Sequence, residues 1–280
     1  MAPSSSMKPR RSRGVGVALS ACCAVACWTS QDAFFGFSAS SRAARTARAA
    51  TSGPAEGQYR LRYFDGKGVV ETARMLFAIA GIDYEDKRYS VTFGTPGDFT
   101  TISRPEFDAD KAAGRMDVAM GKVPILENAG SEFMLPQSKS IERYLARKFG
   151  MMGSTEEEGA WVDAIGEHLR DINDVYNKKG MFFMKDAEKK AELQKTWFEQ
   201  ELPPMLQNLE KVLPGSAGFA VGSTLSLADV QLYKLLKDTY GDQDISAAYA
   251  SCPKLQAIVS KLQEHQGLQK WIAERPKTMF

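Results

Sequence analysis

Cysteine and histidine are scarce in this chain. Its 280 residues include four cysteines and two histidines, and after residue 56 only Cys252, His168 and His265 remain. A single cysteine cannot form an internal disulfide, and these three residues cannot supply the Cys and His cluster of a structural zinc site. We therefore expect an apolar core to stabilise the fold, and we predict no metal site.

A strong charge of one sign is also missing from most of the chain. Residues 1–56 hold seven Lys or Arg against two acidic residues, whereas the other 224 residues hold 29 basic and 32 acidic ones. A nucleic-acid-binding domain normally carries a basic patch or a clear basic excess. We expect no nucleic-acid partner.

Residues 1–56 have the composition of a targeting leader. Four basic residues precede an apolar run at 15–28, which is too short to span a bilayer comfortably, and residues 33–55 carry three arginines and no acidic residue. The sequence DAFFGF at 32–37 resembles the phenylalanine-marked boundary of the bipartite plastid leaders of algae with complex plastids. We predict a disordered leader that directs the protein to a plastid, with the secretory pathway as the alternative. No stable membrane anchor is expected after its removal.

The next part of the sequence predicts a small α/β domain. Residues 59–64 alternate like a half-buried strand, a helix with apolar spacing follows and stops at Gly81, and residues 84–91 form a second strand. Residues 92–120 are expected to be irregular, with one short helical turn. The order of strand, helix and strand predicts a parallel pair.

A strand–strand–helix unit completes this domain. We expect strands at 123–127 and 132–134, joined by a hairpin at 128–130, and then a helix at 137–149. A proline at the start of a strand leaves backbone groups exposed, and a helix N-terminus offers unpaired N–H groups to an anion. Pro124 and the pair Gln137-Ser138 therefore predict a cradle for a small peptide-like ligand with carboxylates.

The remainder of the sequence predicts helices only. Long helices are expected at 154–178 and 186–213, and Ser-Leu-Ala-Asp at 226–229 is a capping box for a helix through Tyr240. Two shorter helices follow, from Pro253 and from Gly267.

Several motifs, in this order, resemble the glutathione S-transferase family, and its sigma class in particular, which includes hematopoietic prostaglandin D synthases. The resemblance implies a thioredoxin-like α/β N-terminal domain at 57–150, an all-α C-terminal domain at 151–280 and a homodimer. The matching segments are residues 59–64, 84–88, 121–126, 137–138, 226–229 and 271–278.

The resemblance implies that Tyr63 is the catalytic residue. Glutathione attacks as a thiolate, and a tyrosine hydroxyl, which stays protonated at neutral pH, can donate a hydrogen bond that stabilises it. Tyr59 lies on the same face of the strand and is the competing candidate.

The resemblance also implies how glutathione, the expected cosubstrate, is held. Val123 pairs its backbone with the cysteinyl unit, a cis peptide before Pro124 shapes the site, and Lys122 lies alongside. Gln137 and Ser138 hold the γ-glutamyl carboxylate, although both could instead be helix caps. Two further expected contacts are Lys111, to the glycyl carboxylate, and Asp171, to the γ-glutamyl amine in the partner subunit, with a solvated lysine and a surface acid as the alternatives.

Two positions depart from the sigma pattern. The arginine that supports the thiolate is replaced by Val69, and whether Lys67 substitutes for it is left open. The acidic cluster that binds a divalent ion in prostaglandin synthases corresponds to Glu167, Arg170 and Asp171, where Arg170 opposes a cation.

The electrophile pocket is expected to include Phe64, Gly68, Asn173 and Tyr176. The predicted function is a detoxifying glutathione transferase, in which the thiolate attacks a hydrophobic electrophile; glutathione-dependent peroxidase activity is a related possibility. The alternatives are a non-catalytic relative with a binding or structural role, and a prostaglandin-type isomerase. A cysteine-type thiol transferase is disfavoured because Asp65-Gly66 stands where its cysteine would be.

Overall fold

The computed structural model describes residues 58–95, 99–181, 184–241 and 243–278. The predicted leader, residues 1–56, lies outside the described residues, so its disorder and its targeting role stay predictions. None of the described helices combines the length and the apolar character needed to cross a membrane.

A four-stranded mixed sheet forms the centre of the first part. Its order is β2 (Tyr84–Tyr89), β1 (Tyr59–Phe64), β5 (Ile125–Asn128) and β6 (Met134–Pro136). β1 pairs in parallel with β2 and antiparallel with β5, and β6 pairs antiparallel with β5. The predicted parallel pair is confirmed, and the last two strands begin two residues later than expected.

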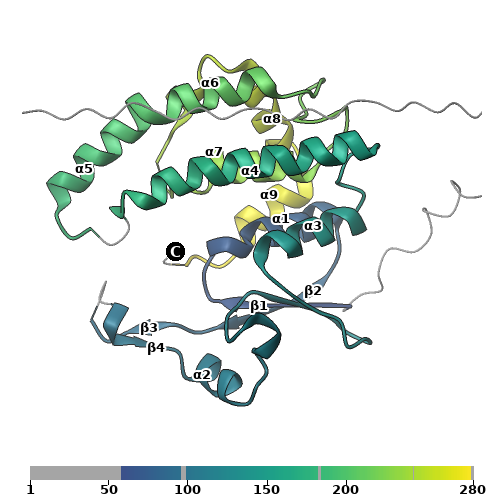
Figure 1. Ribbon diagram of the computed structural model, residues 1–280, viewed down its shortest axis with the longest axis vertical. Helices are drawn as coiled ribbons and strands as arrows, with labels where there is room; N and C mark the ends of the chain where they lie inside the picture. Colours follow the sequence, from purple (N-terminus) through teal and green to yellow (C-terminus); the bar gives the residue numbers. More distant parts are fainter. Residues whose placement is uncertain (1–57, 96–98, 182–183, 242, 279–280) are drawn as a thin grey trace, which may run out of the picture. The chain divides into compact units, whose positions relative to one another are not determined.

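Helices cover both faces of this sheet (Figure 1). α1 (Glu71–Ala80) and α3 (Ser138–Lys148) lie on the face toward the remaining helices, and α2 (Pro105–Ala112) lies on the opposite face. α1 ends where predicted, because Gly81 adopts a left-handed φ of 65°, a conformation that glycine takes without steric cost.

The expectation for residues 92–120 was wrong. This segment contains a short hairpin of β3 (Thr92–Phe93) and β4 (Ile102–Ser103), the two-turn helix α2 and a 3-10 turn at Asp117–Ala119. Pro105 is the first residue of α2. The backbone N–H at this position has no acceptor within a helix, so proline, which lacks an N–H, is well tolerated there. The apolar signal was weak because Phe107 is the one buried residue of α2.

The second part is helical, as expected, with one interruption. The predicted helix at 186–213 contains a π-helical turn at Trp197–Glu201, next to Pro203 and Pro204, which lack N–H donors. Its helices are α4 (Glu156–Lys178), α5 (Ala187–Thr196), α6 (Leu202–Val212), α7 (Leu227–Lys237), α8 (Pro253–Gln263) and α9 (Gln266–Glu274).

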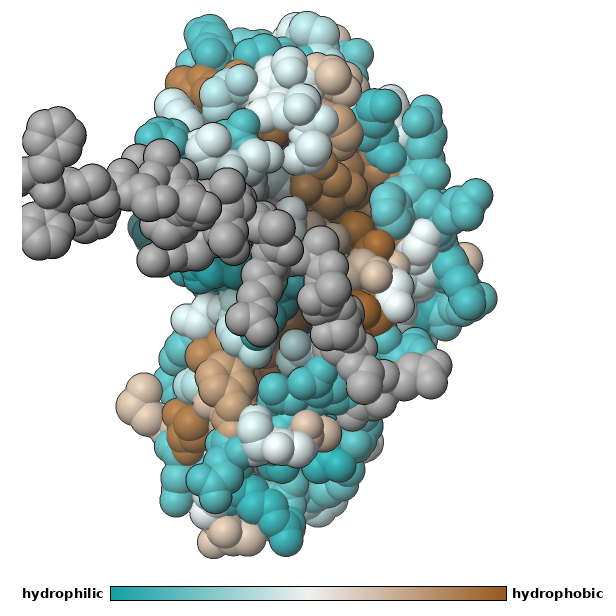
Figure 2. All heavy atoms as spheres, turned by 90° about the vertical axis from the view of Figure 1, so that its right-hand side faces the viewer, coloured by the Kyte–Doolittle hydropathy of each residue, from teal (hydrophilic) through white to brown (hydrophobic). Residues whose placement is uncertain are grey.

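The two parts share a core. α1 packs against α7 and α9, and one continuous apolar cluster runs from Tyr59 on the sheet to Leu268 on α9. A second, smaller cluster lies on the other face of the sheet, around Tyr89 and Phe107. On the face shown in Figure 2, the outer surfaces are mostly hydrophilic and apolar surface gathers largely toward the middle of the molecule. The predicted fold class, an α/β domain followed by helices, is confirmed, whereas the boundary between residues 150 and 151 stays a prediction.

The predicted capping box at the start of α7 is present and buried. Asp229 is 0% exposed, and its carboxylate accepts hydrogen bonds from Ser226 N at 2.8 Å, Ser226 Oγ at 2.7 Å and Ala220 N at 2.6 Å. It thus fixes both the helix start and the loop before it.

Replacing Asp229 by alanine should lower the free energy of unfolding by about 3 kcal/mol, because the buried donors lose a charged acceptor. Urea denaturation measures this loss. The matched control is Asp186→Ala, which removes the cap of α5 at an exposed position, where the bond from Lys189 N is 3.0 Å long; its cost should be about 1 kcal/mol. Equal losses in the two variants would contradict the structural importance of the buried cap.

Candidate functional site

The predicted cradle residues fall in a row across one end of the sheet. The β1–β5 pairing ends at Arg62 and Ile125, so one further step of this register sets Tyr63 opposite Pro124. The β5–β6 pairing ends at Ile125 and Pro136, and its next step sets Gln137 opposite Pro124. The peptide bond between Val123 and Pro124 is cis, as predicted. Tyr63, Pro124 and Gln137 therefore lie next to one another where β1 and β6 end and β5 begins.

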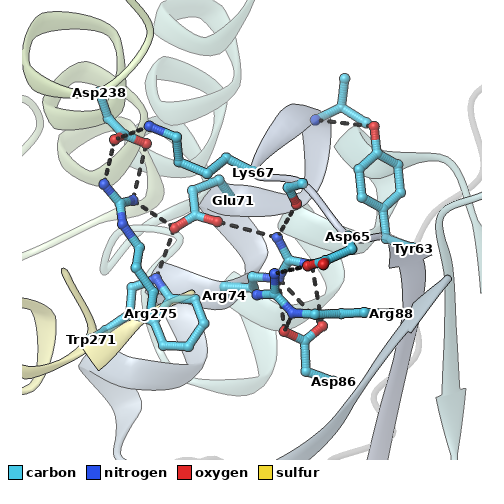
Figure 3. Close-up of polar contacts among 12 residues, drawn as sticks. Tyr63, Asp65, Lys67, Glu71, Arg74, Asp86, Arg88, Asp238, Trp271 and Arg275 are labelled. Atoms are coloured by element: carbon cyan, nitrogen blue, oxygen red, sulfur yellow. Dashed lines mark hydrogen bonds and ion pairs between the residues drawn. The ribbon is translucent and has the colours of Figure 1, made fainter. Parts of the chain in front are cut away.

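Tyr63 lies at the end of β1 with its hydroxyl over the loop that follows. The Val69 N–H donates to Tyr63 Oη at 3.5 Å (Figure 3), and Gly68 lies against the hydroxyl-bearing edge of the ring. A Cβ at Gly68 would come within 2.6 Å of that oxygen, and Gly68 has a positive φ of 46°. The ring can approach the loop only because this position is glycine.

The Tyr63 hydroxyl is suited to donate a hydrogen bond. Burial raises the pKa of Tyr63, while the Val69 N–H and the charge of Arg74 oppose that rise. Among the described residues none accepts the hydroxyl proton. The group is therefore a protonated donor at neutral pH, available to a ligand.

Tyr59, the competing tyrosine, is in a different environment. It is 3% exposed and packs against Phe77 with ring centroids 5.6 Å apart. Burial raises its pKa to about 12. Tyr59 is a core residue on this evidence.

Gln137 and Ser138 stand where α3 begins. Gln137 has a φ of 75°, a left-handed value that is uncommon for a residue other than glycine, and its side chain makes no capping hydrogen bond. Simple capping therefore does not account for Gln137. Strained backbone conformations of this kind cluster at active sites and ligand clamps, and nothing in the local sequence indicated this one.

The two predicted lysines border the loop before Pro124. The Lys111 side chain lies against Gly121, which has a positive φ of 72° and so little bulk that the lysine Cε approaches its backbone closely. Lys122 follows directly and is exposed. Lys111 is thus next to the cis-proline loop although it comes from α2. Asp171 is exposed on α4, and its predicted contact with a partner subunit stays a prediction.

The four residues expected around the electrophile do not share one pocket. Gly68 and Asn173 line a cleft of about 260 Å³ between α1, α3, α4 and α7, which Ser138 also borders. Phe64 instead packs against Phe107 on the other face of the sheet, with centroids 5.0 Å apart. Strand alternation explains this, because neighbours on a strand face opposite sides.

Tyr176 also lies away from the residues that line this cleft. It packs against Trp197 and Tyr240, with centroids 5.4 and 4.9 Å apart, inside the helical part. The α4 face on which Tyr176 lies packs against other helices, and its place in the electrophile pocket stays a prediction. Asn173, three residues earlier, borders the cleft, and its amide donates to the Leu169 carbonyl at 2.9 Å.

At the acidic cluster considered for a metal, charges are paired. Glu167 accepts from Arg143 at 2.7 Å and from Arg170 at 2.6 Å. Two guanidinium groups on one carboxylate leave little negative potential for a cation.

Comparisons with known proteins identify the family of this chain. The family model described as glutathione S-transferase, N-terminal domain, matches residues 59–147, and the one for the C-terminal domain matches residues 173–275. Glutathione S-transferase 4 of Caenorhabditis elegans is 31% identical, over 78% of this chain and 96% of the relative. The chain belongs to the glutathione S-transferase family.

Two other similar proteins show the breadth of this family. S-crystallin SL11 of Nototodarus sloanii is 34% identical, over 79% of this chain and 98% of the relative. The solved structure of a Nu-class glutathione S-transferase from Haemonchus contortus matches with a TM-score of 0.62 and 30% identity, over 79% of this chain and 98% of that one. Both matches extend over nearly the whole of each relative.

In this glutathione S-transferase family member, a network of charges holds the loop below Tyr63 (Figure 3). Lys67 Nζ lies 3.1 Å from Asp238 on α7, so its ammonium is directed away from the Tyr63 hydroxyl. Lys67 therefore does not take the place of the arginine that the sigma pattern has at Val69. Val69 contributes its backbone N–H instead.

The same network contains groups that the sequence did not suggest. Arg74 is 0% exposed and donates to the Gly66 carbonyl at 2.6 Å, to Glu71 at 3.3 Å and to Asp86 at 3.2 Å. Arg275, close to the C-terminus, binds both Glu71 and Asp238. The i to i+3 spacing of Glu71 and Arg74 could have indicated their pairing, but Arg275 lies 204 residues from Glu71 and has no local signal.

Neutralising Asp238 with asparagine should lower the free energy of unfolding at pH 7 by about 3 kcal/mol, since Lys67 and Arg275 lose a mostly buried partner. Burial alone would raise the pKa of Asp238, but the hydrogen bonds and charges of Arg275 and Lys67 outweigh it and lower the pKa. A lowered folded-state pKa gives stability above the unfolded value, 3.8, that is lost as the pH falls through the folded-state value. The difference between wild type and D238N should therefore shrink below about pH 4, as measured by urea denaturation at several pH values.

The matched control for this experiment is Glu85→Gln. Glu85 pairs with Arg60 at a site where both side chains are about half exposed, so its loss should cost less than about 1 kcal/mol. A D238N effect of the same small size would show that the buried network contributes little to stability.

Proposed function

We propose that this protein is a glutathione transferase in which Tyr63 stabilises the thiolate of glutathione during attack on hydrophobic electrophiles. The observation that carries the proposal is the Tyr63 hydroxyl, which accepts from the Val69 N–H and keeps its own proton available, in line with the cis-Pro124 loop. A hydrogen bond to the sulfur stabilises the charged form. Each unit by which it lowers the thiol pKa favours the thiolate by about 1.4 kcal/mol.

In the proposed complex, glutathione lies along the edge where β1, β5 and β6 end. The backbone of Val123 pairs with the cysteinyl unit, and the free N–H groups at the start of α3, with Gln137 and Ser138, hold the γ-glutamyl carboxylate. The Lys111 side chain lies against Gly121, and Lys122 directly precedes the Val123-Pro124 bond, so both cations suit the glycyl carboxylate.

The finer assignments are also proposals. Sigma-class membership is supported by the sequence motifs, whereas a similar solved structure is titled Nu-class. A homodimer, completed by Asp171 from the partner subunit, plastid targeting by residues 1–56 and glutathione-dependent reduction of hydroperoxides follow from the sequence argument. No metal is assigned, because the described residues contain no group of three His, Cys, Asp or Glu side chains suited to hold one.

A second candidate is a non-catalytic binding or structural protein. The similarity to S-crystallin SL11 and the valine at position 69 favour it. The available hydroxyl of Tyr63 and the left-handed Gln137 favour the transferase, since a purely structural protein has no need of either.

Substituting phenylalanine for Tyr63 tests the transferase directly. In the assay, the glutathione sulfur bonds to the ring carbon of an activated aryl halide, and the halide leaves with the bonding pair. Loss of one positioned donor should reduce kcat/KM about 100-fold and raise the pKa of bound glutathione, which ultraviolet absorbance of the thiolate reports. Tyr59→Phe is the control and should keep nearly full activity, because its hydroxyl lies in the core.

Equal rates for wild type and Y63F would exclude the role of Tyr63. If the wild-type protein bound no glutathione in calorimetry, the structural alternative would replace the transferase.

A methyl group at Gly68 should displace the Tyr63 ring. Gly68→Ala brings a Cβ to within 2.6 Å of the hydroxyl, so the ring must move, and kcat/KM should fall about tenfold or more. Gly81→Ala is the matched control, because Gly81 has a similar φ of 65° and nothing within 4 Å of the added Cβ. Both variants should lose about 1 kcal/mol or more of stability from backbone strain, but activity should fall only in G68A. Equal activity in G68A and G81A would show that the position of Tyr63 is not critical.

A further inference from the structure

The cleft beside Tyr63 is lined by both apolar and polar side chains, and one cation that reaches it has no partner among the described residues. Val69, Leu169 and Leu235 supply apolar surface, and Lys234 of α7 reaches the same cleft. The Lys234 ammonium makes no hydrogen bond or ion pair with any residue that the structure describes, although the side chain is half-buried. Removing a lysine from water without a counter-charge is unfavourable, so a cation left this way needs an explanation.

The carboxylates around Lys234 are all bound to other groups. Glu142, on α3, is 0% exposed and accepts from Lys139 at 2.9 Å and from Gln231 at 2.6 Å. Glu71, on α1, is bound by Arg74, Arg275 and Trp271. Asp238, directly after the last residue of α7, is bound by Lys67 and Arg275.

The charges of this region leave Lys234 in excess. Five carboxylates are paired with five cations, and Lys234 is a sixth cation. The carboxylates are Asp65, Glu71, Asp86, Glu142 and Asp238, and the paired cations are Lys67, Arg74, Arg88, Lys139 and Arg275.

The electrostatics of Lys234 fit a position prepared for an anion. Burial lowers its pKa, and the charge of Lys139 lowers it further, while Glu142, Asp238 and Glu71 act in the opposite direction without compensating fully. An anion in the cleft would stabilise the charged form of Lys234. In the free protein the surrounding carboxylates stabilise the charged form only in part, because each is paired with a cation of its own.

We propose that the electrophile of this enzyme is an amphipathic molecule with a carboxylate on an apolar chain, and that Lys234 binds this carboxylate. Val69, Leu169 and Leu235 contact the apolar chain of the electrophile. The Lys234 ammonium binds its carboxylate, at the end that lies away from the sulfur. This inference rests on the proposed transferase function and names its substrate class. A neutral electrophile would contact the apolar residues of the cleft but leave the half-buried ammonium of Lys234 unpaired.

The test compares an aliphatic enone that has a terminal carboxylate with its methyl ester. The glutathione thiolate bonds to the β-carbon, the C=C electron pair moves to the carbonyl as an enolate, and water protonates the α-carbon; the thiol proton goes to solvent. Wild-type protein should show a kcat/KM about tenfold higher for the acid than for the ester, because only the acid forms a charge-assisted bond with Lys234.

Lys234→Met should remove this preference. It should lower kcat/KM for the acid about tenfold and leave the ester within about twofold of wild type. Lys234→Arg keeps the charge and should restore most of the preference, which a loss of folding could not do. Lys237→Met, at an exposed position of the same helix, is the control and should keep the wild-type ratio.

Several outcomes would overturn the inference. A wild-type ratio near one, or an equal loss for acid and ester in K234M, would exclude a carboxylate site at Lys234. A higher KM for glutathione in K234M, with the ester as electrophile, would assign Lys234 to glutathione instead. Turnover of the aryl halide by wild type separates these results from failure of the proposed function, since a protein inactive on all three electrophiles loses both proposals.

Discussion

The buried carboxylate of Glu71 is the constraint on which much of this structure depends. Glu71 is 1% exposed, so its charge has almost no water to solvate it. It is stabilised by Arg74 from the next turn of α1 and by Trp271 and Arg275, both at 2.8 Å, from the end of the chain. A buried charge that loses its partners costs several kcal/mol. The start of α1 can therefore be buried only when the C-terminal segment is in place, which couples the sheet domain to the helical one.

This coupling reaches Tyr63 through the loop between β1 and α1. Arg74 holds the Gly66 carbonyl from below, and Lys67 is held by Asp238 from α7 (Figure 3). The loop then continues into Gly68 and the Val69 N–H, which contact the tyrosine hydroxyl. A donor held this way needs no reorganisation when a sulfur arrives, and a preorganised donor is worth more than a mobile one. In the proposed mechanism, residues far from the sulfur determine how well Tyr63 works.

The order of strands and helices could be predicted from the sequence, because it depends on local periodicity and caps. β1, α1 with its stop at Gly81, and the capping box of α7 are examples. α2 was not predicted, because an exposed helix with one buried aromatic residue shows almost no periodic pattern of apolar residues. Phe64 was misplaced because adjacency to Tyr63 in sequence was taken as adjacency in space, whereas strand geometry turns it to the other face.

The local features of the candidate site could be predicted from the sequence, whereas its long-range contacts could not. The position of Gln137-Ser138 follows from the strand–strand–helix motif, which is contained within about 25 residues, whereas the cis peptide before Pro124 was expected from the family resemblance. The pairing of Lys67 with Asp238 joins residues 171 positions apart and depends on how the domains pack. No local rule could have shown that Lys67 is engaged there, or that Lys234 is left without a partner.

Loss of the arginine at position 69 does not by itself remove positive potential from the site. The charge of Arg74 acts on Tyr63, and because Arg74 is fully buried, solvent and salt screen it little. A flexible arginine on the loop would add charge but would also occupy space beside the sulfur, where Val69 is 51% exposed. With valine at position 69 this side of the cleft is apolar. The cation without a partner is instead Lys234 of α7, which lines the same cleft. In the proposed enzyme this arrangement separates two tasks, because the backbone and Arg74 support the tyrosine while Lys234 selects the electrophile.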